Sequence, residues 1–510
     1  MRVVLGLAVA ALVTATVLSA EEPLLSHAGC SAPGDPVEPA LLERPTAMVE
    51  GIGRVHQDIT TGSAGAQAYY DQGLTQLHHY VWIEAARSFH QALRLDADCA
   101  MCWMGLARAE QGMERAEATA TAIARALALA PKAGERERRF IALRAQQIAA
   151  QNTAEDAEKH GAYKAALDAA LATYPDDAEL WVLRGNAEEP GAWGRGQFGG
   201  AASIAFYETA LVRSPGHLGA HHYLVHSFEN IAHHAEAAGH AKVYAAASPR
   251  VAHAQHMFGH VLPRLGRWEE ALAQFRKADE IEETYARSVG LRPGDDWHHL
   301  HNLQLLGFTA LRLGRADEAE AAFRRAFETP SRVPYRGREQ AGLAELYLLQ
   351  GRLQEALAAA RAIQAATRTP AARTVGAAVE GEALLALGRL EAARAAAARS
   401  AELLEVARRE AGSSRRYVDV VVKPYVEQLR AALALRADGA GQAEGGLLAV
   451  ADDVAANPRF DAWGEGLFRL QRLAQDARRA GRAELAAGLE ARMRKIDAAY
   501  APKPMAGGPR

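Results

Sequence analysis

Residues 252–278 read AHAQHMFGHVLPRLGRWEEALAQFRKA, and their spacing recurs through most of the chain. Small residues and one aromatic residue occupy positions 8, 15, 20, 24 and 27 of a 34-residue unit, namely Gly259, Gly266, Ala271, Phe275 and Ala278. The unit that starts near residue 300 fills the same positions with Gly307, Gly314, Ala319, Phe323 and Ala326. Small residues let two antiparallel helices touch, and the bulky residue near position 24 fills the space beside them. The pattern predicts a repeated helix–turn–helix unit.

The turn inside the unit recurs further along the chain, as Gly–Arg pairs at 351–352, 388–389 and 481–482. These residues resemble the tetratricopeptide repeat, a helix–turn–helix unit of 34 residues. The resemblance covers most of residues 66–410 and returns near 460–497. It implies an all-α fold, a right-handed superhelical solenoid of tetratricopeptide-type helical hairpins over residues 66–500.

Composition agrees with a folded helical protein and excludes some functions. The chain has 510 residues, 49% hydrophobic and 23% charged, which is too long for one core and too apolar for wholesale disorder. Lys plus Arg number 58 and Asp plus Glu 61, for a formal net charge of −3. A net charge so close to zero does not favour binding of nucleic acid or of an anionic membrane.

The first 20 residues, MRVVLGLAVAALVTATVLSA, have a positive start, an apolar run and small residues at the end. This pattern is typical of a secretory signal peptide, so we predict an exported, periplasmic or secreted protein with no membrane span after cleavage. A lipoprotein acylated at Cys30 is the disfavoured alternative, because His27 stands where an aliphatic residue is needed. Residues 21–65 carry scattered Pro and Gly and are expected to form a linker or irregular arm. Residues 501–510 are expected to form a disordered tail.

Histidine is concentrated in one section of the chain, since thirteen of its 19 histidines lie in residues 217–301. His222 and His226 are four residues apart and share one face of a helix. The pair recurs 34 residues later as His256 and His260, so both pairs occupy positions 5 and 9 of adjacent units. Duplication of one hairpin would also produce this register. Duplication does not explain why only these units are rich in histidine.

In tetratricopeptide proteins, positions 2, 5 and 9 of the first helix line the concave groove. By that resemblance one stretch of groove would gather six histidines: His222, His226, His253, His256, His260 and His301. Imidazoles from neighbouring helices can share a metal ion that lies about 2.0–2.1 Å from each nitrogen, and Zn or Cu suits such ligands. Glu229, one turn beyond His226, is a candidate carboxylate ligand or acceptor for a ligating imidazole.

A closer resemblance is to an uncharacterised group of exported bacterial tetratricopeptide proteins. It rests on the strings DADCAMCWMGLA (96–107), GHLGAHHYLVHSFE (216–229) and AHAQHMFGHVLPRLGRW (252–268). Cys99 and Cys102 in the first string are expected to be a local disulfide or a pair of half-buried thiols, with a soft-metal site as the alternative. They are not a c-type haem site, because Trp103 follows where histidine is needed.

Residues 187–201, AEEPGAWGRGQFGGA, interrupt one hairpin and are expected to form a mobile lid beside the histidines. Two functions then compete. The first is an exported binding scaffold whose histidine-lined groove takes a protein or peptide partner, or a transition metal. The second is a metal-dependent enzyme, for example a hydrolase, in which one coordination position stays open to water. No residue pattern identifies a substrate, so we do not predict an enzyme.

Overall fold

The computed structural model describes residues 37–151, 157–189, 194–291, 297–329, 337–367, 369–411, 418–436, 441–456 and 462–499. Within these ranges every regular element is a helix, which confirms the predicted all-α solenoid. The predicted signal peptide (1–20) and the predicted tail (501–510) lie outside the described residues. No helix in these ranges combines the length and the apolar character needed to cross a membrane.

The helices of the N-terminal half are α1 (Pro39–Leu42), α2 (Ala64–His78), α3 (Trp82–Leu95), α4 (Ala100–Gly112), α5 (Ala116–Leu129), α6 (Glu135–Gln151), α7 (Ala157–Thr173), α8 (Ala178–Asn186), α9 (Ala201–Arg213), α10 (Leu218–Asn230) and α11 (His234–Ala247). Then come α12 (Ala252–Val261), α13 (Trp268–Val289), α14 (Trp297–Arg312), α15 (Ala316–Glu328), α16 (Gly337–Gln350), α17 (Leu353–Ala366), α18 (Pro370–Ala386), α19 (Leu390–Glu410), α21 (Lys423–Ala434), α22 (Gly441–Ala456), α23 (Leu467–Arg479) and α24 (Ala483–Ile496). Short 3-10 helices span Ala130–Lys132 and Leu262–Leu265, and short π-helices span Val418–Val422 and Ala462–Gly466.

Successive helices pack as hairpins, from α2 with α3 through α18 with α19, and then α21 with α22 and α23 with α24. Positions 8 and 24 meet inside the hairpins, as the sequence predicts. A Cβ added to Gly73 would lie 2.7 Å from the ring of Phe89, and one added to Gly307 would lie 2.5 Å from the ring of Phe323. Glycine is therefore required at these places, because any side chain there would collide with the aromatic ring.

The turn inside the hairpins places the residue at position 15 in the left-handed region of the backbone. Gly266 and Gly314 hold that position with φ of 72° and 78°. Tyr80, Glu114 and Ala232 hold it with φ of 60°, 58° and 62°, although each carries a Cβ. Left-handed backbone costs a residue with a Cβ roughly 1–2 kcal/mol. These three turns therefore store strain that the glycine turns do not.

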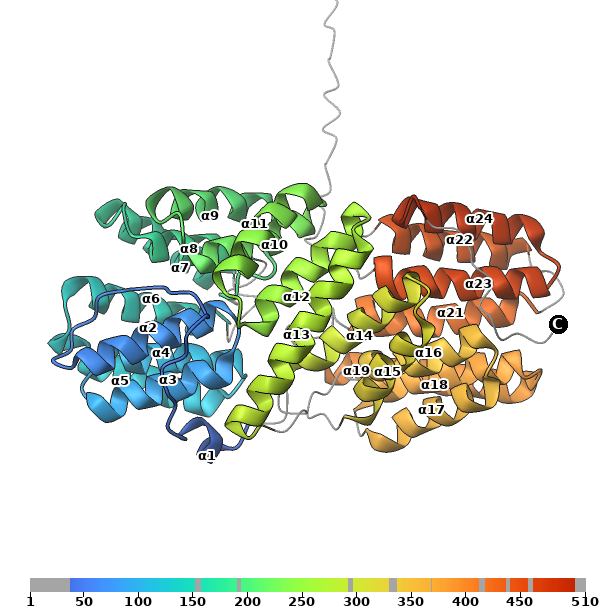
Figure 1. The fold of residues 1–510 in the computed structure, drawn as a ribbon, viewed down its shortest axis with the longest axis horizontal. Helices are drawn as coiled ribbons and strands as arrows, with labels where there is room; N and C mark the ends of the chain where they lie inside the picture. Colours follow the sequence, from blue (N-terminus) through green and yellow to red (C-terminus); the bar gives the residue numbers. More distant parts are fainter. Residues whose placement is uncertain are drawn as a thin grey trace, which may run out of the picture.

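The solenoid curls back on itself in both halves (Figure 1). In the N-terminal half, α2 packs against α10. In the C-terminal half, α14 meets the last hairpin: Phe308 stacks on Phe468 with ring centroids 5.6 Å apart, and Arg312 pairs with Asp497 at 2.5 Å. The α12–α13 hairpin lies between the two halves. Each half therefore has an enclosed inner side.

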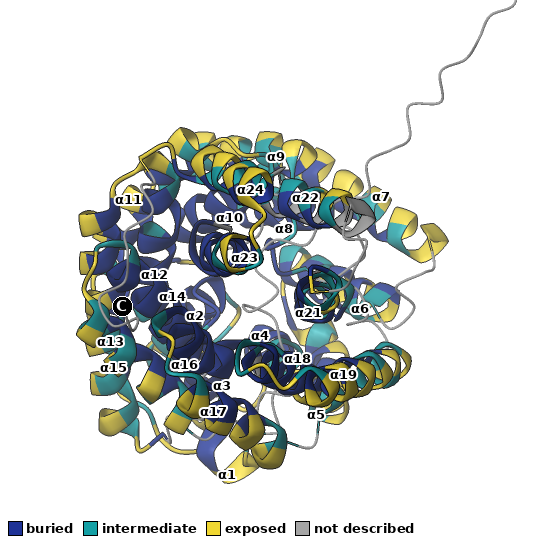
Figure 2. Ribbon diagram, turned by 90° about the vertical axis from the view of Figure 1, so that its right-hand side faces the viewer, coloured by how far each residue is buried: buried dark blue, intermediate teal, exposed yellow. Residues whose placement is uncertain are grey.

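Buried residues gather on the inner helices and exposed residues on the outer ones (Figure 2). Helix α10 is the extreme case, because every residue from Leu218 to Asn230 is buried. The first helix of each hairpin faces inward, and the histidine pairs at positions 5 and 9 belong to such helices. Side chains at these positions therefore point into the protein.

Residues 43–63, inside the predicted arm, pack against the N-terminal half. The Val55 amide donates to Oγ1 of Thr75 at 2.9 Å, and the carbonyl oxygen of Ile52 accepts from His79 Nε2 at 2.7 Å. The Arg250 amide donates to the carbonyl oxygen of Gly51 at 2.9 Å. The arm is thus joined by hydrogen bonds to the first hairpin and to the start of α12.

Candidate metal centre

Three histidine side chains meet in the interior of the N-terminal half. His222 and His226 lie one turn apart on α10, and His253 lies in the first turn of α12. The Nε2 atom of His222 is 3.1 Å from Nε2 of His226 and 3.0 Å from Nε2 of His253. All three residues are at most 2% exposed, and one ligand atom from each lies within 4.8 Å of the others. We call these three residues the first triad.

A backbone carbonyl determines which nitrogen of His222 carries the proton. Nδ1 of His222 is 2.6 Å from the carbonyl oxygen of His78, which can only accept, so Nδ1 donates. The other nitrogen of a neutral imidazole then presents its single lone pair. Two further imidazole nitrogens approach that lone pair, from His226 and His253. A cation shared by the three nitrogens accounts for both contacts.

The geometry of the first triad fits a transition-metal ion. Two nitrogens bound at about 2.0–2.1 Å in a tetrahedral shell stand roughly 3.3 Å apart, and the two short contacts measure 3.0 and 3.1 Å. Burial lowers the pKa of His222 and of His253 well below the ordinary value, so both are neutral, which is the form that binds metals. A ligating histidine usually donates its other N–H to an oxygen, as His222 does to His78.

Tyr80 covers the first triad from the turn between α2 and α3. Its ring centroid lies 4.5 Å from that of His222 and 5.3 Å from that of His253. Its hydroxyl donates to the carbonyl oxygen of Arg195 at 2.7 Å. The strained left-handed turn at Tyr80 therefore places an aromatic ring directly against the imidazoles, and backbone strain often accompanies a functional site.

The insertion predicted as a lid lies inside the protein in its described part. Nδ2 of Asn230 donates to the carbonyl oxygens of Gln197 and Gly199 at 3.1 and 2.6 Å. Glu189 accepts from the Phe198 amide at 2.7 Å, and burial raises the pKa of this carboxyl to about 7. These bonds hold residues 194–199 against α10. The histidines consequently lie in a filled interior, which differs from the open groove expected from the repeat positions.

The remaining predicted ligands form a second group one hairpin further along. His256 and His260 lie on α12 and His301 on α14, and we call these three residues the second triad. The His256 ring centroid lies 5.8 Å from that of His260 and 5.2 Å from that of His301. Nδ1 of His260 donates to Oε1 of Glu229 on α10 at 2.8 Å. The predicted ligands are thus divided between two places, with Glu229 beside the second.

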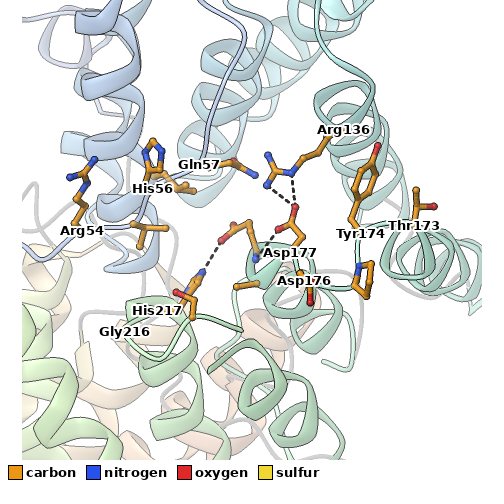
Figure 3. A pocket seen from close by; sticks show the side chains of 16 residues that line it. Arg54, His56, Gln57, Arg136, Thr173, Tyr174, Asp176, Asp177, Gly216 and His217 are labelled. Carbon is orange, nitrogen blue, oxygen red and sulfur yellow. Dashed lines mark hydrogen bonds and ion pairs between the residues drawn. The ribbon is translucent and has the colours of Figure 1, made fainter. Parts of the chain in front are cut away.

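A carboxylate group that the sequence reasoning did not include lies near the first triad. Glu179 accepts from Nε2 of His78 at 3.0 Å, Nε2 of His217 at 3.3 Å and Nη1 of Arg108 at 3.0 Å. Burial by itself would raise the pKa of Glu179, but these three neighbours hold it well below its usual range. Figure 3 shows His217 pointing into the adjoining cavity, which measures about 700 Å³.

This Glu179 group does not suit a metal ion. Nδ1 of His217 accepts from the Ala220 amide at 3.2 Å and caps α10, so Nε2 is the nitrogen that donates to Glu179. Metal binding at Nε2 would move the proton to Nδ1, against the Ala220 N–H. Arg108 already balances the carboxylate charge. The group is a hydrogen-bond network that supports α10.

A second cavity connects the first triad with its surroundings. It measures about 610 Å³ and reaches His253 and His298. Its walls come from the N-terminal arm, including Val49 and Ile52, and from α13, including Glu282. Of the first triad, His253 lines this cavity, whereas His222 and His226 do not.

Cys99 and Cys102 form a disulfide across the start of α4. Both residues are buried, at 1% and 0% exposure. The pair is therefore not a pair of thiols in this structure, and its sulfurs are not available to a soft metal. Of the two predicted states, the structure contains the local disulfide.

The sequence reasoning missed residues that contact the first triad from outside the repeat positions 2, 5 and 9. His78 supports His222 through a backbone carbonyl, which no residue pattern reveals. His298, which is not among the predicted ligands, is 7% exposed, and its ring centroid lies 4.4 Å from that of His253. The adjacent pair His78–His79 in the first unit was a signal that the sequence offered. In the structure both side chains are fully buried.

Comparison with known families identifies the repeat. Residues 300–330 match the family model described as tetratricopeptide repeat. The match falls within the hairpins that follow the 34-residue frame, so the prediction of tetratricopeptide repeats in a helical solenoid is confirmed. The narrower group that shares the CAMC and HxxxH segments stays a prediction.

The chain is also similar to solved structures. One is a tetratricopeptide repeat protein from Parabacteroides merdae ATCC 43184, with 15% identity and a TM-score of 0.37 over 57% of this chain and 99% of that one. Another is PilW, described as a widely conserved type IV pilus biogenesis factor, with 16% identity and a TM-score of 0.26 over 52% of this chain and 93% of that one. A search of the curated proteins found no match.

Proposed function

We propose that this chain is an exported tetratricopeptide scaffold that holds a transition-metal ion at His222, His226 and His253. The observation that carries the proposal is the approach of two imidazole nitrogens, at 3.0 and 3.1 Å, to the single lone pair of His222 Nε2. Zinc and copper both suit imidazole ligands.

The competing explanation is a core of hydrogen-bonded histidines. In that case either two N–H groups would share the single lone pair of His222 Nε2, or one of the two short contacts would bring two lone pairs together. Buried polar groups are nearly always satisfied, so a core that needs two donors on one lone pair is unfavourable. An ion bound by all three nitrogens would not require two donors on one lone pair.

Three protein ligands leave a fourth coordination position for another group. The cavity of about 610 Å³ that reaches His253 is the observation in favour of a metal-dependent enzyme as the second candidate function. Water bound at the open position would be activated for hydrolysis. The scaffold remains our first choice, because no substrate-binding pattern accompanies the cavity.

A protein or peptide partner belongs to the proposal, since solenoids of this class present extended surfaces to partners. Side chains and residues 194–199 fill the space around the first triad, so such a partner would contact other faces of the solenoid. Export is supported by the signal-like residues 1–20 and by the Cys99–Cys102 disulfide, because disulfides persist in oxidising compartments.

The test is elemental analysis of protein purified without a histidine tag and loaded with Zn²⁺ or Cu²⁺. We expect His222→Gln/His253→Gln to lose an ion that the wild type retains. His233→Gln is the matched control, because His233 is a histidine of the same region whose side chain is 55% exposed. Circular dichroism would verify that each variant is folded. Wild-type protein that holds no metal after loading would contradict the proposal.

A further inference from the structure

We propose that the second triad, His256, His260 and His301, is a second metal site, related to the first by the repeat itself. The chain would then hold two transition-metal ions in adjacent hairpins. This inference rests on the proposed function, because it assigns to the second triad the role argued for the first.

The two triads are built from the same positions of successive units. His222 and His226 at positions 5 and 9 become His256 and His260 one unit later, 34 residues on. The third member is in both cases the residue at position 2 of the following unit. His253 and His301 are 48 residues apart because residues 284–297 are inserted between them. The structure thus repeats a three-residue constellation rather than a pair.

The distances between ring centroids at equivalent positions are similar in the two triads. Between positions 9 and 2 the ring centroids are 6.4 Å apart in both triads. Between positions 5 and 2 they are 4.8 Å apart in the first and 5.2 Å in the second. Between positions 5 and 9 the values are 4.9 and 5.8 Å. The second triad is the wider of the two, because its three ligand nitrogens do not all lie within the 4.8 Å that holds for the first triad, so its rings would have to move inward to bind one ion.

In the second triad, a side-chain oxygen faces the Nδ1 atom of each histidine. His260 Nδ1 donates to Oε1 of Glu229 at 2.8 Å, and His256 Nδ1 donates to Oδ1 of Asn302 at 3.1 Å. The orientation of the Asn302 amide follows from its Nδ2, which donates to the carbonyl oxygen of Phe275 at 2.9 Å. Nδ1 of His301 faces Oε1 of Gln304 at 3.4 Å. Such outer acceptors are typical of histidines that bind metal through Nε2.

The Nε2 atom of His256 is a candidate metal ligand. It is buried, since the residue is 2% exposed, and in the described part of the chain it has no hydrogen-bond partner. Nδ1 carries the proton, so Nε2 holds a lone pair without a donor. A metal ion at the second triad would accept this lone pair.

Charge favours a cation at the second triad. Glu229 is 3% exposed and lies directly behind His260, so its carboxylate forms a carboxylate–histidine arrangement that raises the basicity of a ligand. Trp463, from the π-helical turn of the C-terminal half, lies edge-on to the His260 ring at 5.9 Å. The site is therefore closed on one side by the second half of the solenoid.

Two double variants distinguish this inference from the proposed function. We expect Zn²⁺-loaded wild type to hold two ions per chain by elemental analysis. His256→Gln/His301→Gln and His222→Gln/His253→Gln should each hold one. If the wild type holds a single ion that His256→Gln/His301→Gln retains, the second site is wrong and the first stands. If that variant loses every ion while folded, the six histidines form one shared site and this inference is overturned.

A milder substitution covers the case in which a double variant does not fold. Glu229→Gln keeps the size of the side chain and removes its charge, so we expect it to weaken one of two Zn²⁺ binding steps by about 10–100-fold, as loss of such an acceptor commonly does. Isothermal titration would resolve the two steps. Glu236→Gln is the control, because the Glu236 side chain is 52% exposed on α11. Two unchanged steps in Glu229→Gln would overturn the assignment.

Discussion

At the scale of single residues, hydrogen-bond partners give two histidines of one region opposite roles. His222 donates through Nδ1 to a carbonyl oxygen, which leaves Nε2 as a lone pair for a metal. His217 accepts through Nδ1 from a backbone amide, which places its proton on Nε2 against Glu179. The backbone group beside Nδ1 therefore decides which histidine is a candidate ligand. Residue identity alone would treat the two as equivalent.

The left-handed turns provide a prediction at the same scale. Ala232 is exposed and has φ of 62°, so Ala232→Gly should relieve strain and raise the stability by about 1 kcal/mol. Ala398 is exposed in the middle of α19, and Ala398→Gly should lower the stability by about 0.5–1 kcal/mol. Urea unfolding of both variants measures the effect. A loss of stability in Ala232→Gly would contradict the strain argument.

At the scale of helices, each hairpin depends on contact between a glycine and an aromatic ring. Phe323 of α15 is wedged between two glycines: a Cβ on Gly307 would lie 2.5 Å from the ring, and one on Gly342 would lie 2.6 Å from it. The ring is fully buried and cannot retreat from either side. This contact joins a hairpin to the next one, because Gly342 lies on α16.

Adding one methyl group tests this packing. Gly307→Ala should destabilise the protein by about 1–3 kcal/mol, because overpacking beside Phe323 outweighs the better helix propensity of alanine. Gly239 lies in α11 with nothing within 4 Å of its added Cβ. Gly239→Ala should therefore stabilise the protein by about 0.5–1 kcal/mol. Thermal unfolding should show a lower midpoint for Gly307→Ala and a higher midpoint for Gly239→Ala. Equal shifts of the two midpoints would refute the packing argument.

At the scale of the whole molecule, closure of each half brings distant charged residues together. In the C-terminal half, Arg472 of α23 lies 2.9 Å from Glu345 of α16 and 3.4 Å from Glu382 of α18. Burial raises the pKa of Glu382 to about 7, assisted by Glu345 and opposed by Arg472. Curling of the solenoid thus creates a titratable group that an open array would leave in water.

This carboxyl group makes stability depend on pH. Its folded pKa of about 7 exceeds the ordinary value of 4.5, so its contribution is fully present below pH 4.5 and is lost as pH rises through 7. Between pH 5 and 8 we expect the free energy of unfolding of the wild type to fall. In Glu382→Gln it should fall by less, with a difference of up to about 3 kcal/mol. Urea midpoints at both pH values would measure it. Glu391→Gln, exposed on α19, should behave as wild type.

Several features could be predicted because they are local. The 34-residue spacing of glycine, alanine and phenylalanine determines hairpins through contacts inside one unit and with the next, and the structure contains them. The same register predicts that His222 and His226 share a helix face, as they do on α10. These inferences need only helical periodicity and nearest-neighbour packing.

The sequence by itself therefore determined the helical repeats and the set of inward-facing histidines. Only the tertiary structure decided how those histidines are grouped, because the rotation between successive hairpins brings position 2 of one unit against positions 5 and 9 of the unit before it. It also decided that Tyr80 and residues 194–199 close over the first triad. Contacts across 100 residues or more, such as His78 with His222, arise from closure of the solenoid, which no local spacing encodes.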